Sequence, residues 1–446
     1  MEGARNGESA LYLGTSESEE EIQRIAVSHG WSLDGVRIHH QPAPELGEEQ
    51  TVLAPAEVEL PQIMKTMLSL VEESQPTRVV LDSMAEIRAM AQNEWWYRRQ
   101  LAALKEHFAD KHCTVLVVEI PAVHETLNSI VSGVVEVRQD APLYGPDRRK
   151  LRVAKIRGHD FATGYHDYKV RRGGIDVFPR LVAAEHRRRV KRETMSTGMP
   201  DLDTMLDGGL IRGTAALLLG PSGTTKSLMA TQLAVAAAER GEPSAMYIFD
   251  ERVQTLLQRA EGVGMPLEKH VEAGTIRVQQ VDPAELTPGE FSHMLKTVVE
   301  EDGIRLVIID SLNGYAYAMP EERLLSVHLH ELTSYLNQQG VTSVFVMTQH
   351  GTISGEVAPP FDVSYISDTV LLFRPFEHAG EIRKAVAVYK HRASAHESSI
   401  HEINISSEGI RLGPPLSQFQ SVLSGAPVFT GDRLNGHAGN AGPDEG

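Results

Sequence analysis

The chain is poor in features that mark secreted and membrane proteins. Its 446 residues include one cysteine, Cys113, so an internal disulfide framework is excluded and a cytoplasmic location is expected. No apolar run approaches the roughly 18–20 residues that span a bilayer, and the N-terminal residues lack the apolar core of a secretory signal. We therefore expect no membrane partner.

Basic residues are also scarce relative to acidic ones. The chain has 43 Lys and Arg against 60 Asp and Glu, a net charge of −17. This balance disfavours nucleic-acid binding through bulk charge. The length exceeds what one hydrophobic core usually serves, so two domains are expected.

The most informative segment is residues 220–227, Gly-Pro-Ser-Gly-Thr-Thr-Lys-Ser, which lie between an apolar run and an alanine-rich helical pattern. A strand, a Gly-rich turn, Lys-Ser and a helix form the context of a phosphate-binding loop. Backbone N–H groups and the helix N-terminus bind the anion, while the Lys reaches the β/γ-phosphates and the Ser ligates Mg²⁺. The predicted phosphate-binding residues are Gly220, Ser222, Gly223, Thr224, Thr225, Lys226 and Ser227.

Thr225 departs from this pattern, because a Gly normally precedes the Lys. The backbone amide that binds phosphate is still present in Thr. The substitution is tolerable if Thr225 adopts helical φ and ψ.

The two halves repeat the same landmarks in the same order, 228–235 residues apart: Tyr12/Tyr247, Glu17/Glu251, Asp82/Asp310 and Lys155/Lys390. Strands alternate with helices in each half, which predicts two tandem α/β domains with mainly parallel sheets. We predict domains over 1–182 and 194–430, a solvated basic linker over 183–193 and a disordered tail over 431–446. Nucleic-acid contact is a weaker interpretation of the basic run.

The first half begins after the point where its own phosphate loop should lie, so we assign it no nucleotide. The strand that feeds such a loop is usually internal to the sheet. Its omission predicts two flanking strands with unpaired edges and an open core. Either a segment upstream of Met1 or another element fills the gap, and the sequence leaves both open.

Polar residues follow several predicted strands of the second half. Asp310 ends one strand and is a candidate Mg²⁺ ligand, with a turn cap as the alternative. Asp250 and Glu251 end another and are candidates to orient or deprotonate water, against a purely helix-capping role. Thr348 or Gln349 ends a third and is a candidate sensor of the γ-phosphate, against plain turn polarity.

Lys390 and Arg392 alternate on a predicted strand and therefore share one face. A pair of cations in this arrangement is a candidate to reach the γ-phosphate of a neighbouring subunit.

Together these residues resemble the KaiC family of RecA-like ATPases over roughly 9–181 and 194–430. The resemblance implies a double RecA-like architecture, the first domain lacking its P-loop segment, and a hexamer with ATP between subunits. It implies MgATP bound by Lys226, Ser227 and Asp310, Glu251 as general base with Asp250 beside it, and Lys390 and Arg392 acting in trans. Further matching segments are Ser196–Gly198, Leu202-Asp203, Gly208–Leu210, Arg212-Gly213, His396, Tyr97–Lys105 and Lys155–Gly158.

Clock-type members of this family phosphorylate an adjacent Ser-Thr pair. Here Ser364 keeps the first acceptor, Tyr365 replaces the second, and Ser367 and Thr369 are nearby reserves. We expect an ATPase, with Ser/Thr autokinase activity and an unknown signalling partner left open. The alternatives are a non-catalytic oligomeric switch held by ATP and, less favoured, a DNA-dependent ATPase.

Overall fold

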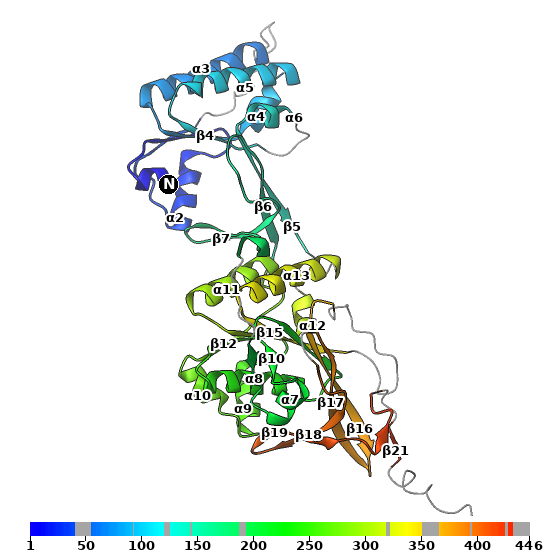
Figure 1. Cartoon of the computed structure of the whole chain (residues 1–446). Helices are drawn as coiled ribbons and strands as arrows, with labels where there is room; N and C mark the ends of the chain where they lie inside the picture. Colours follow the sequence, from blue (N-terminus) through cyan, green and yellow to red (C-terminus); the bar gives the residue numbers. More distant parts are fainter. Residues whose placement is uncertain are drawn as a thin grey trace, which may run out of the picture. The chain divides into compact units, whose positions relative to one another are not determined.

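A computed structural model describes residues 1–40, 55–91, 93–119, 125–142, 145–186, 193–317, 322–349, 365–392, 395–423 and 427–430. It divides into two compact units (Figure 1): unit 1 comprises 1–139 and 149–177, and unit 2 comprises 140–148 and 178–446. Residues 187–192 of the predicted linker and the predicted tail, 431–446, lie outside the described residues. None of the described helices combines the length and apolar character that a membrane crossing requires.

Unit 2 is built around one large sheet. Its helices are η1 (Ala183–His186, 3₁₀), α7 (Pro200–Met205), α8 (Lys226–Glu239), α9 (Val253–Glu261), α10 (Leu267–Glu272), α11 (Pro288–Glu301), α12 (Leu312–Ala316) and α13 (Glu322–Gln338). Its strands are β9 (Thr194–Met195), β10 (Leu210–Ile211), β11 (Ala215–Gly220), β12 (Ser244–Ile248), β13 (Ile276–Gln280), β14 (Leu306–Asp310), β15 (Thr342–Thr348), β16 (Thr369–His378), β17 (Glu381–His391), β18 (Ile400–Ser406), β19 (Gly409–Pro415), β20 (Phe419–Gln420) and β21 (Val428–Phe429).

The large sheet has the order β13-β12-β14-β15-β11-β16-β17-β18-β19. Strands from β13 to β16 pair in parallel, and β16 to β19 pair antiparallel. One face packs on α7–α10, and the other packs on α11–α13 (Figure 1). Strand β11 is therefore internal and buried on both faces, and the carboxyl ends of β11, β12, β14 and β15 meet at one edge, where ligands of parallel sheets bind.

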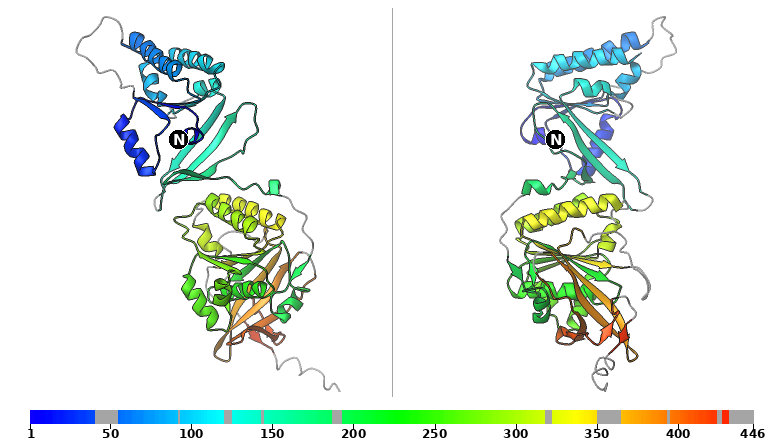
Figure 2. Two further views of the ribbon diagram at one scale, coloured as in Figure 1. Left: turned by 90° about the vertical axis from the view of Figure 1, so that its left-hand side faces the viewer. Right: turned by 45° about the vertical axis from the view of Figure 1, so that its right-hand side comes forward.

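Unit 1 repeats part of this plan (Figure 2). Its helices are α1 (Glu2–Arg5), α2 (Glu19–His29), α3 (Pro55–Ser74), α4 (Met84–Met90), α5 (Glu94–Ala109) and α6 (Glu125–Ile130). Its strands are β1 (Ala10–Gly14), β2 (Val36–His40), β3 (Arg78–Asp82), β4 (Thr114–Val117), β5 (Gly133–Asp140), β6 (Arg148–Ile156), β7 (His166–Arg171) and β8 (Gly174–Phe178). A capping box between Ser18 and Glu21 begins α2, and Gly30 ends it in the left-handed conformation.

The strands of unit 1 form two sheets, β2-β1-β3-β4 and β5-β6-β7-β8. Aligned with unit 2, these match β13-β12-β14-β15 and β16-β17-β18-β19, and no described strand of unit 1 takes the place of β11. Strands β4 and β5 are consequently the ends of their sheets. The expected unpaired edges are present in the described residues, and the expected α/β class with tandem domains is confirmed.

The sheet register corrects one predicted repeat pair. Gly14 pairs with Asp82 in unit 1, and Ile248 pairs with Asp310 in unit 2. Tyr12 is therefore equivalent to Met246, and Tyr247 is equivalent to Leu13. A slip of one residue moves a strand side chain to the opposite face of the sheet, so Tyr12 faces the side that α8 covers in unit 2.

Part of the predicted linker is ordered within unit 2. Residues 183–186 form η1, in which the Ala183 N–H donates to Glu331 and the His186 carbonyl accepts from Gln339. Ala183 is buried against the core beneath α13. The basic composition of the segment predicts exposure to solvent, whereas the apolar Ala183 at its start packs into the core.

Candidate nucleotide-binding site

The predicted phosphate loop follows β11 at the carboxyl edge of the sheet. Strand β16 lies so close that a Cβ on Gly220 would stand 2.4 Å from the Phe373 carbonyl oxygen, so only glycine fits there. The Gln349 N–H donates to the Gly220 carbonyl at 3.1 Å. The Thr224 hydroxyl donates to the Pro221 carbonyl at 2.7 Å. Ser222 and Gly223 lie between these anchors, and Gly223 has a φ of 78°.

Thr225 does not have the right-handed helical dihedrals that would have made it a neutral replacement for Gly. Its φ is 79° and its ψ is 4°, in the left-handed region, at the N-cap of α8. A β-branched residue is strained in that region. Its buried Oγ1 has no partner within the described part of the chain. A Gly would adopt this left-handed backbone conformation at a lower free energy than Thr does.

Lys226 is buried at the first position of α8, and its Nζ donates to the Pro221 carbonyl at 2.6 Å. Burial lowers the pKa of this ammonium to about 8, and the nearby Asp310 carboxylate opposes the shift. A buried cation that keeps its charge needs an anion. The loop therefore offers the positive end of a phosphate site.

Asp310 ends β14 and is also buried. Burial raises the pKa of its carboxyl group to about 6, while a hydrogen bond from Ser227 and the Arg259 charge lower it. This hydrogen bond joins the two predicted metal ligands, Asp310 at the end of β14 and Ser227 on the first turn of α8. A hydroxyl and a carboxylate are oxygen ligands of the kind that Mg²⁺ takes beside phosphates.

The paired carboxylates after β12 have separate partners. Asp250 accepts a hydrogen bond from Ser311, which follows Asp310 directly. Glu251 accepts from Arg259 of α9 at 2.7 Å and is largely buried. The first contact ties the loop after β12 to the end of β14. The second holds Glu251 in an ion pair.

Arg259 and Asn313 are site residues that the sequence analysis did not identify. Asn313 bridges α12 and β15, since its Nδ2 donates to the Thr348 carbonyl at 3.0 Å and its Oδ1 accepts from the Thr348 N–H at 2.7 Å. Gln349, next along, is buried beside Gly220. The position of Asn313 three residues after the strand-ending Asp310 is the only sequence signal for this bridge.

Lys390 and Arg392 lie at the opposite edge of the same sheet. Lys390 pairs with Val370 of β16 and donates to the Ser367 carbonyl at 2.7 Å. Arg392 follows β17 and lies 3.9 Å from Asp368, whose N–H donates to Ala215 at the start of β11. The five-residue rise from Ala215 to Gly220 is about 17 Å. Arg392 therefore does not reach the phosphate loop of its own chain, and Lys390, level with Leu217 through Val370, is bonded away from the loop at Ser367.

Ser364, the predicted phosphoacceptor, lies outside the described residues. Tyr365 is exposed. Ser367 and Thr369 are fully buried, and the Thr369 hydroxyl is 2.8 Å from Nδ1 of His391. This burial contradicts their prediction as reserve acceptors, because a phosphoryl donor cannot approach a hydroxyl inside the sheet.

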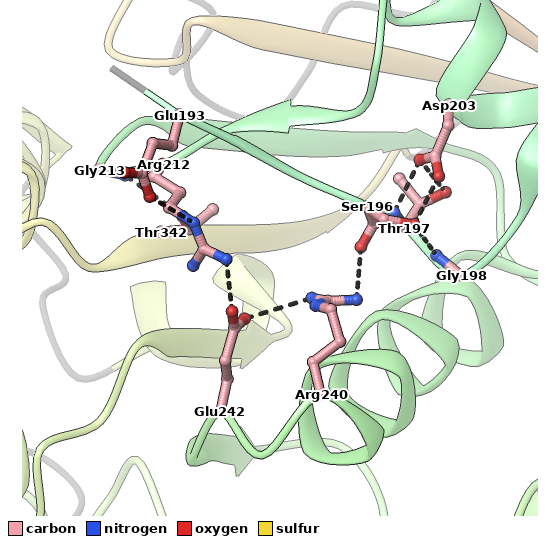
Figure 3. Close-up of polar contacts among 10 residues, drawn as sticks. All are labelled: Glu193, Ser196, Thr197, Gly198, Asp203, Arg212, Gly213, Arg240, Glu242 and Thr342. Carbon is pink, nitrogen blue, oxygen red and sulfur yellow. Dashed lines mark hydrogen bonds and ion pairs between the residues drawn. The ribbon is translucent and has the colours of Figure 1, made fainter. Parts of the chain in front are cut away.

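The Ser-Thr-Gly segment before the loop is structural (Figure 3). The Ser196 and Thr197 hydroxyls and the Thr197 N–H donate to Asp203 of α7, and Arg240 at the end of α8 donates to the Ser196 carbonyl at 2.9 Å. Glu242 accepts from Arg240 and from Arg212. These contacts fasten the base of β11 and the C-terminal end of α8, away from the phosphate loop.

Comparison with known proteins agrees with this architecture. The family model described as "ATPase: KaiC" matches residues 1–182 and again residues 195–417. These matches cover most of the chain, which therefore belongs to the KaiC family of ATPases.

Individual relatives are distant but aligned almost end to end. The circadian clock protein KaiC3 of Synechocystis sp. is 24% identical over 98% of this chain and 89% of its own length. The circadian clock oscillator proteins KaiC of Acaryochloris marina and Synechococcus elongatus are each 24% identical over 94% of this chain, covering 81% and 82% of their own lengths.

Proposed function

We propose that this chain binds and hydrolyses ATP with Mg²⁺ at the loop of unit 2. The observation that carries the proposal is the convergence of a buried cation, Lys226, with the bonded pair Ser227 and Asp310 at one sheet edge. This donor set fits a metal-bound triphosphate, because it combines a desolvated ammonium, oxygen ligands and a helix N-terminus. When bound, Mg²⁺ neutralises charge that develops on the phosphates.

The residues of the chain take distinct roles in this proposal. Lys226 leaves the Pro221 carbonyl to pair with a phosphate, and Ser227 and Asp310 hold the metal. Glu251 orients the attacking water and accepts its proton once Arg259 has released it. Asp250, fixed by Ser311, keeps this loop in place. Gln349 is proposed to sense the γ-phosphate, and the bond from its N–H to Gly220 supports this role.

We also propose a ring of identical subunits, as a hexamer, with ATP between neighbours. The position of Lys390 and Arg392 supports it, because both lie at the sheet edge away from their own loop. In a ring they reach the γ-phosphate of the next subunit, where a cation stabilises the transition state. ATP that bridges two subunits also stabilises their association by mass action.

The general-base assignment is tested with Glu251→Gln. We expect ATP binding to persist and phosphate release to fall to background. The matched control is Glu17→Gln in unit 1, which keeps the wild-type rate because unit 1 has no described phosphate loop. Unchanged hydrolysis in Glu251→Gln would remove Glu251 from the mechanism.

A second candidate function is a switch in which ATP binding holds the oligomer for a signalling partner without turnover. The 2.7 Å ion pair of Glu251 with Arg259 favours it, because a carboxylate that already accepts from a guanidinium is not free to accept the proton of a water molecule. Phosphate release discriminates the two: the switch predicts background release in the wild type and ATP-dependent assembly, and the ATPase predicts release that Glu251→Gln abolishes.

Autophosphorylation, if present, is proposed at Ser364. Its short side chain suits a donor that must come within about 3–3.5 Å of the acceptor oxygen, whereas the Tyr365 oxygen lies several ångströms farther from the backbone. Incubation with labelled ATP and phosphosite mapping tests this. Label on Ser364 that a Ser364→Ala variant loses is the expected result, and label on Tyr365 would refute the argument.

A further inference from the structure

Arg259 is a cation that α9 holds against the carboxylates of the candidate site. It lies in the last turn of α9, and its Nη2 donates to Oε1 of Glu251 at 2.7 Å. Burial raises the pKa of Asp310, whereas the Ser227 hydrogen bond and the Arg259 charge lower it, so the guanidinium also lies near Asp310. The same cation therefore faces the proposed general base and a proposed metal ligand.

The sheet places these two carboxylates close together at its carboxyl edge. Ile248 of β12 pairs with Asp310 of β14, and the Phe249 N–H donates to the Asp310 carbonyl at 2.8 Å. Glu251 comes two residues after Phe249, and α9 begins at Val253. This short connection keeps a long side chain of α9 within reach of the edge where ligands of parallel sheets bind.

The contact with Glu251 uses little of the bonding capacity of Arg259. A guanidinium has five N–H donors in a planar fork, which matches the oxygens of a phosphate or a carboxylate in pairs. Nη2 bonds to Glu251, while the buried Nε has no partner among the residues that the structure describes. A buried donor without an acceptor costs free energy. The site therefore favours a ligand that brings several acceptor oxygens.

We propose that Arg259 is a further catalytic residue of this site, which exchanges Glu251 for the γ-phosphate when MgATP binds. The inference rests on the proposed ATPase function of unit 2. In the free chain the ion pair occupies Glu251. With ATP bound, the guanidinium pairs with γ-phosphate oxygens, and the released carboxylate orients the attacking water.

The hydrolytic step then balances without a proton from Arg259. The water oxygen forms a bond to the γ-phosphorus as the bond from phosphorus to the β,γ-bridging oxygen breaks, and Glu251 accepts a proton of the water. ADP and inorganic phosphate leave. Arg259 stays protonated throughout and stabilises the charge on the transferred group.

The test compares two nucleotides, because only one of them carries the γ-phosphate. Titration calorimetry of the full chain measures the affinities for MgADP and for the Mg²⁺ complex of the β,γ-imido analogue of ATP. Arg259→Ala should weaken binding of the analogue about tenfold, since it removes a charge-assisted contact, and should leave MgADP binding unchanged. Release of phosphate from ATP should fall by about 10²-fold or more. The matched control is Arg277→Ala, which breaks a 2.7 Å ion pair with Asp302 and should change neither affinity.

Further variants separate the exchange from a purely structural role of the ion pair. Glu251→Gln removes the competing charge, so the analogue should bind about twofold or more tightly than to the wild type. The same change in the Arg259→Ala background should give a smaller gain, because no guanidinium is left to be released. Arg259→Lys keeps a cation beside Glu251 but loses the fork, and it covers the case in which loss of the ion pair loosens α9. It should bind the analogue more weakly and MgADP as the wild type does.

Several results would overturn the role of Arg259 while the proposed function stands. They are equal weakening of both nucleotides in Arg259→Ala, no weakening of either, and an equal gain from Glu251→Gln in both backgrounds. Faster phosphate release in Arg259→Ala would show that the ion pair only restrains Glu251. If the wild type bound neither nucleotide, the proposed function itself would fail, and the role of Arg259 with it.

Discussion

Units 1 and 2 share a strand order, yet they differ at one central position. In unit 2, β11 joins the two parts of a nine-stranded sheet and leads into the phosphate loop, whereas the described strands of unit 1 form two four-stranded sheets. One segment thus supplies both continuity of the sheet and the anion site. A domain without it loses both, even when its other strands keep their places.

The carboxylates that end β3 and β14 show the chemical side of this difference. Asp310 contacts Ser227 of the first turn of α8. Its counterpart Asp82 accepts a hydrogen bond from the Tyr12 phenol at 2.6 Å. Burial and the Asp82 contact raise the pKa of Tyr12, so its phenol stays a donor. An Asp at the end of this strand therefore does not make a metal site unless the phosphate loop lies beside it.

The largest effect should come from neutralising one of these carboxylates. Asp310→Asn removes the charged metal ligand, and we expect phosphate release to fall to background. Asp82→Asn changes the same position in unit 1 and should keep the wild-type rate. Phosphate-release assays compare the two variants. Loss of turnover in Asp82→Asn would mean that unit 1 takes part in the chemistry.

The next effect concerns the cation that acts between subunits. Arg392→Ala should lower turnover by about 10³-fold, the low end for such a residue. Mixing it with Lys226→Ala should restore part of the activity, because an intact loop then meets an intact Arg392 from the other variant. Mixtures that stay as inactive as the separate variants would contradict action in trans.

The pH dependence of ATP binding should follow the protonation of Lys226 and Asp310 in unit 2. Lys226 loses its proton as pH rises through about 8, so affinity should fall above that pH by up to about tenfold per pH unit. Asp310 gains a proton as pH falls through about 6, so Mg²⁺-dependent affinity should fall below it. Titration calorimetry between pH 5 and pH 9.5 measures this window. Flat affinity across it would contradict the assignment of both groups.

The smallest effect should come from Thr225→Gly. Relief of the left-handed conformation stabilises unit 2 by about 1–2 kcal/mol. Thr224→Gly is the matched control and should destabilise unit 2, because it removes the bond to the Pro221 carbonyl. Hydrogen exchange of unit 2 segments reports both changes, and unit 1 segments should be unaffected. Faster exchange in Thr225→Gly would show that Thr225 is not strained.

The sequence predicts the loop, the strand-ending Asp310 and the unpaired strand edges of unit 1, because each depends on local spacing or on counting elements. It does not predict the backbone of Thr225, since a left-handed residue is chosen by the turn around it. The Arg259–Glu251 pair depends on how α9 packs. The predicted match of Tyr12 with Tyr247 is wrong by one residue. Short repeats align equally well in two ways, and only the strand pairing distinguishes them.

The central claim, that nucleotide belongs to unit 2, is tested most directly by counting bound ATP per chain. Equilibrium dialysis with saturating MgATP should give one ATP per chain for the wild type and for Lys155→Ala in unit 1. Lys226→Ala should give none, because the charge-assisted contact to the phosphates that is lost is worth about 1.5–3 kcal/mol. Two ATP per wild-type chain, or binding that survives in Lys226→Ala, would contradict the account.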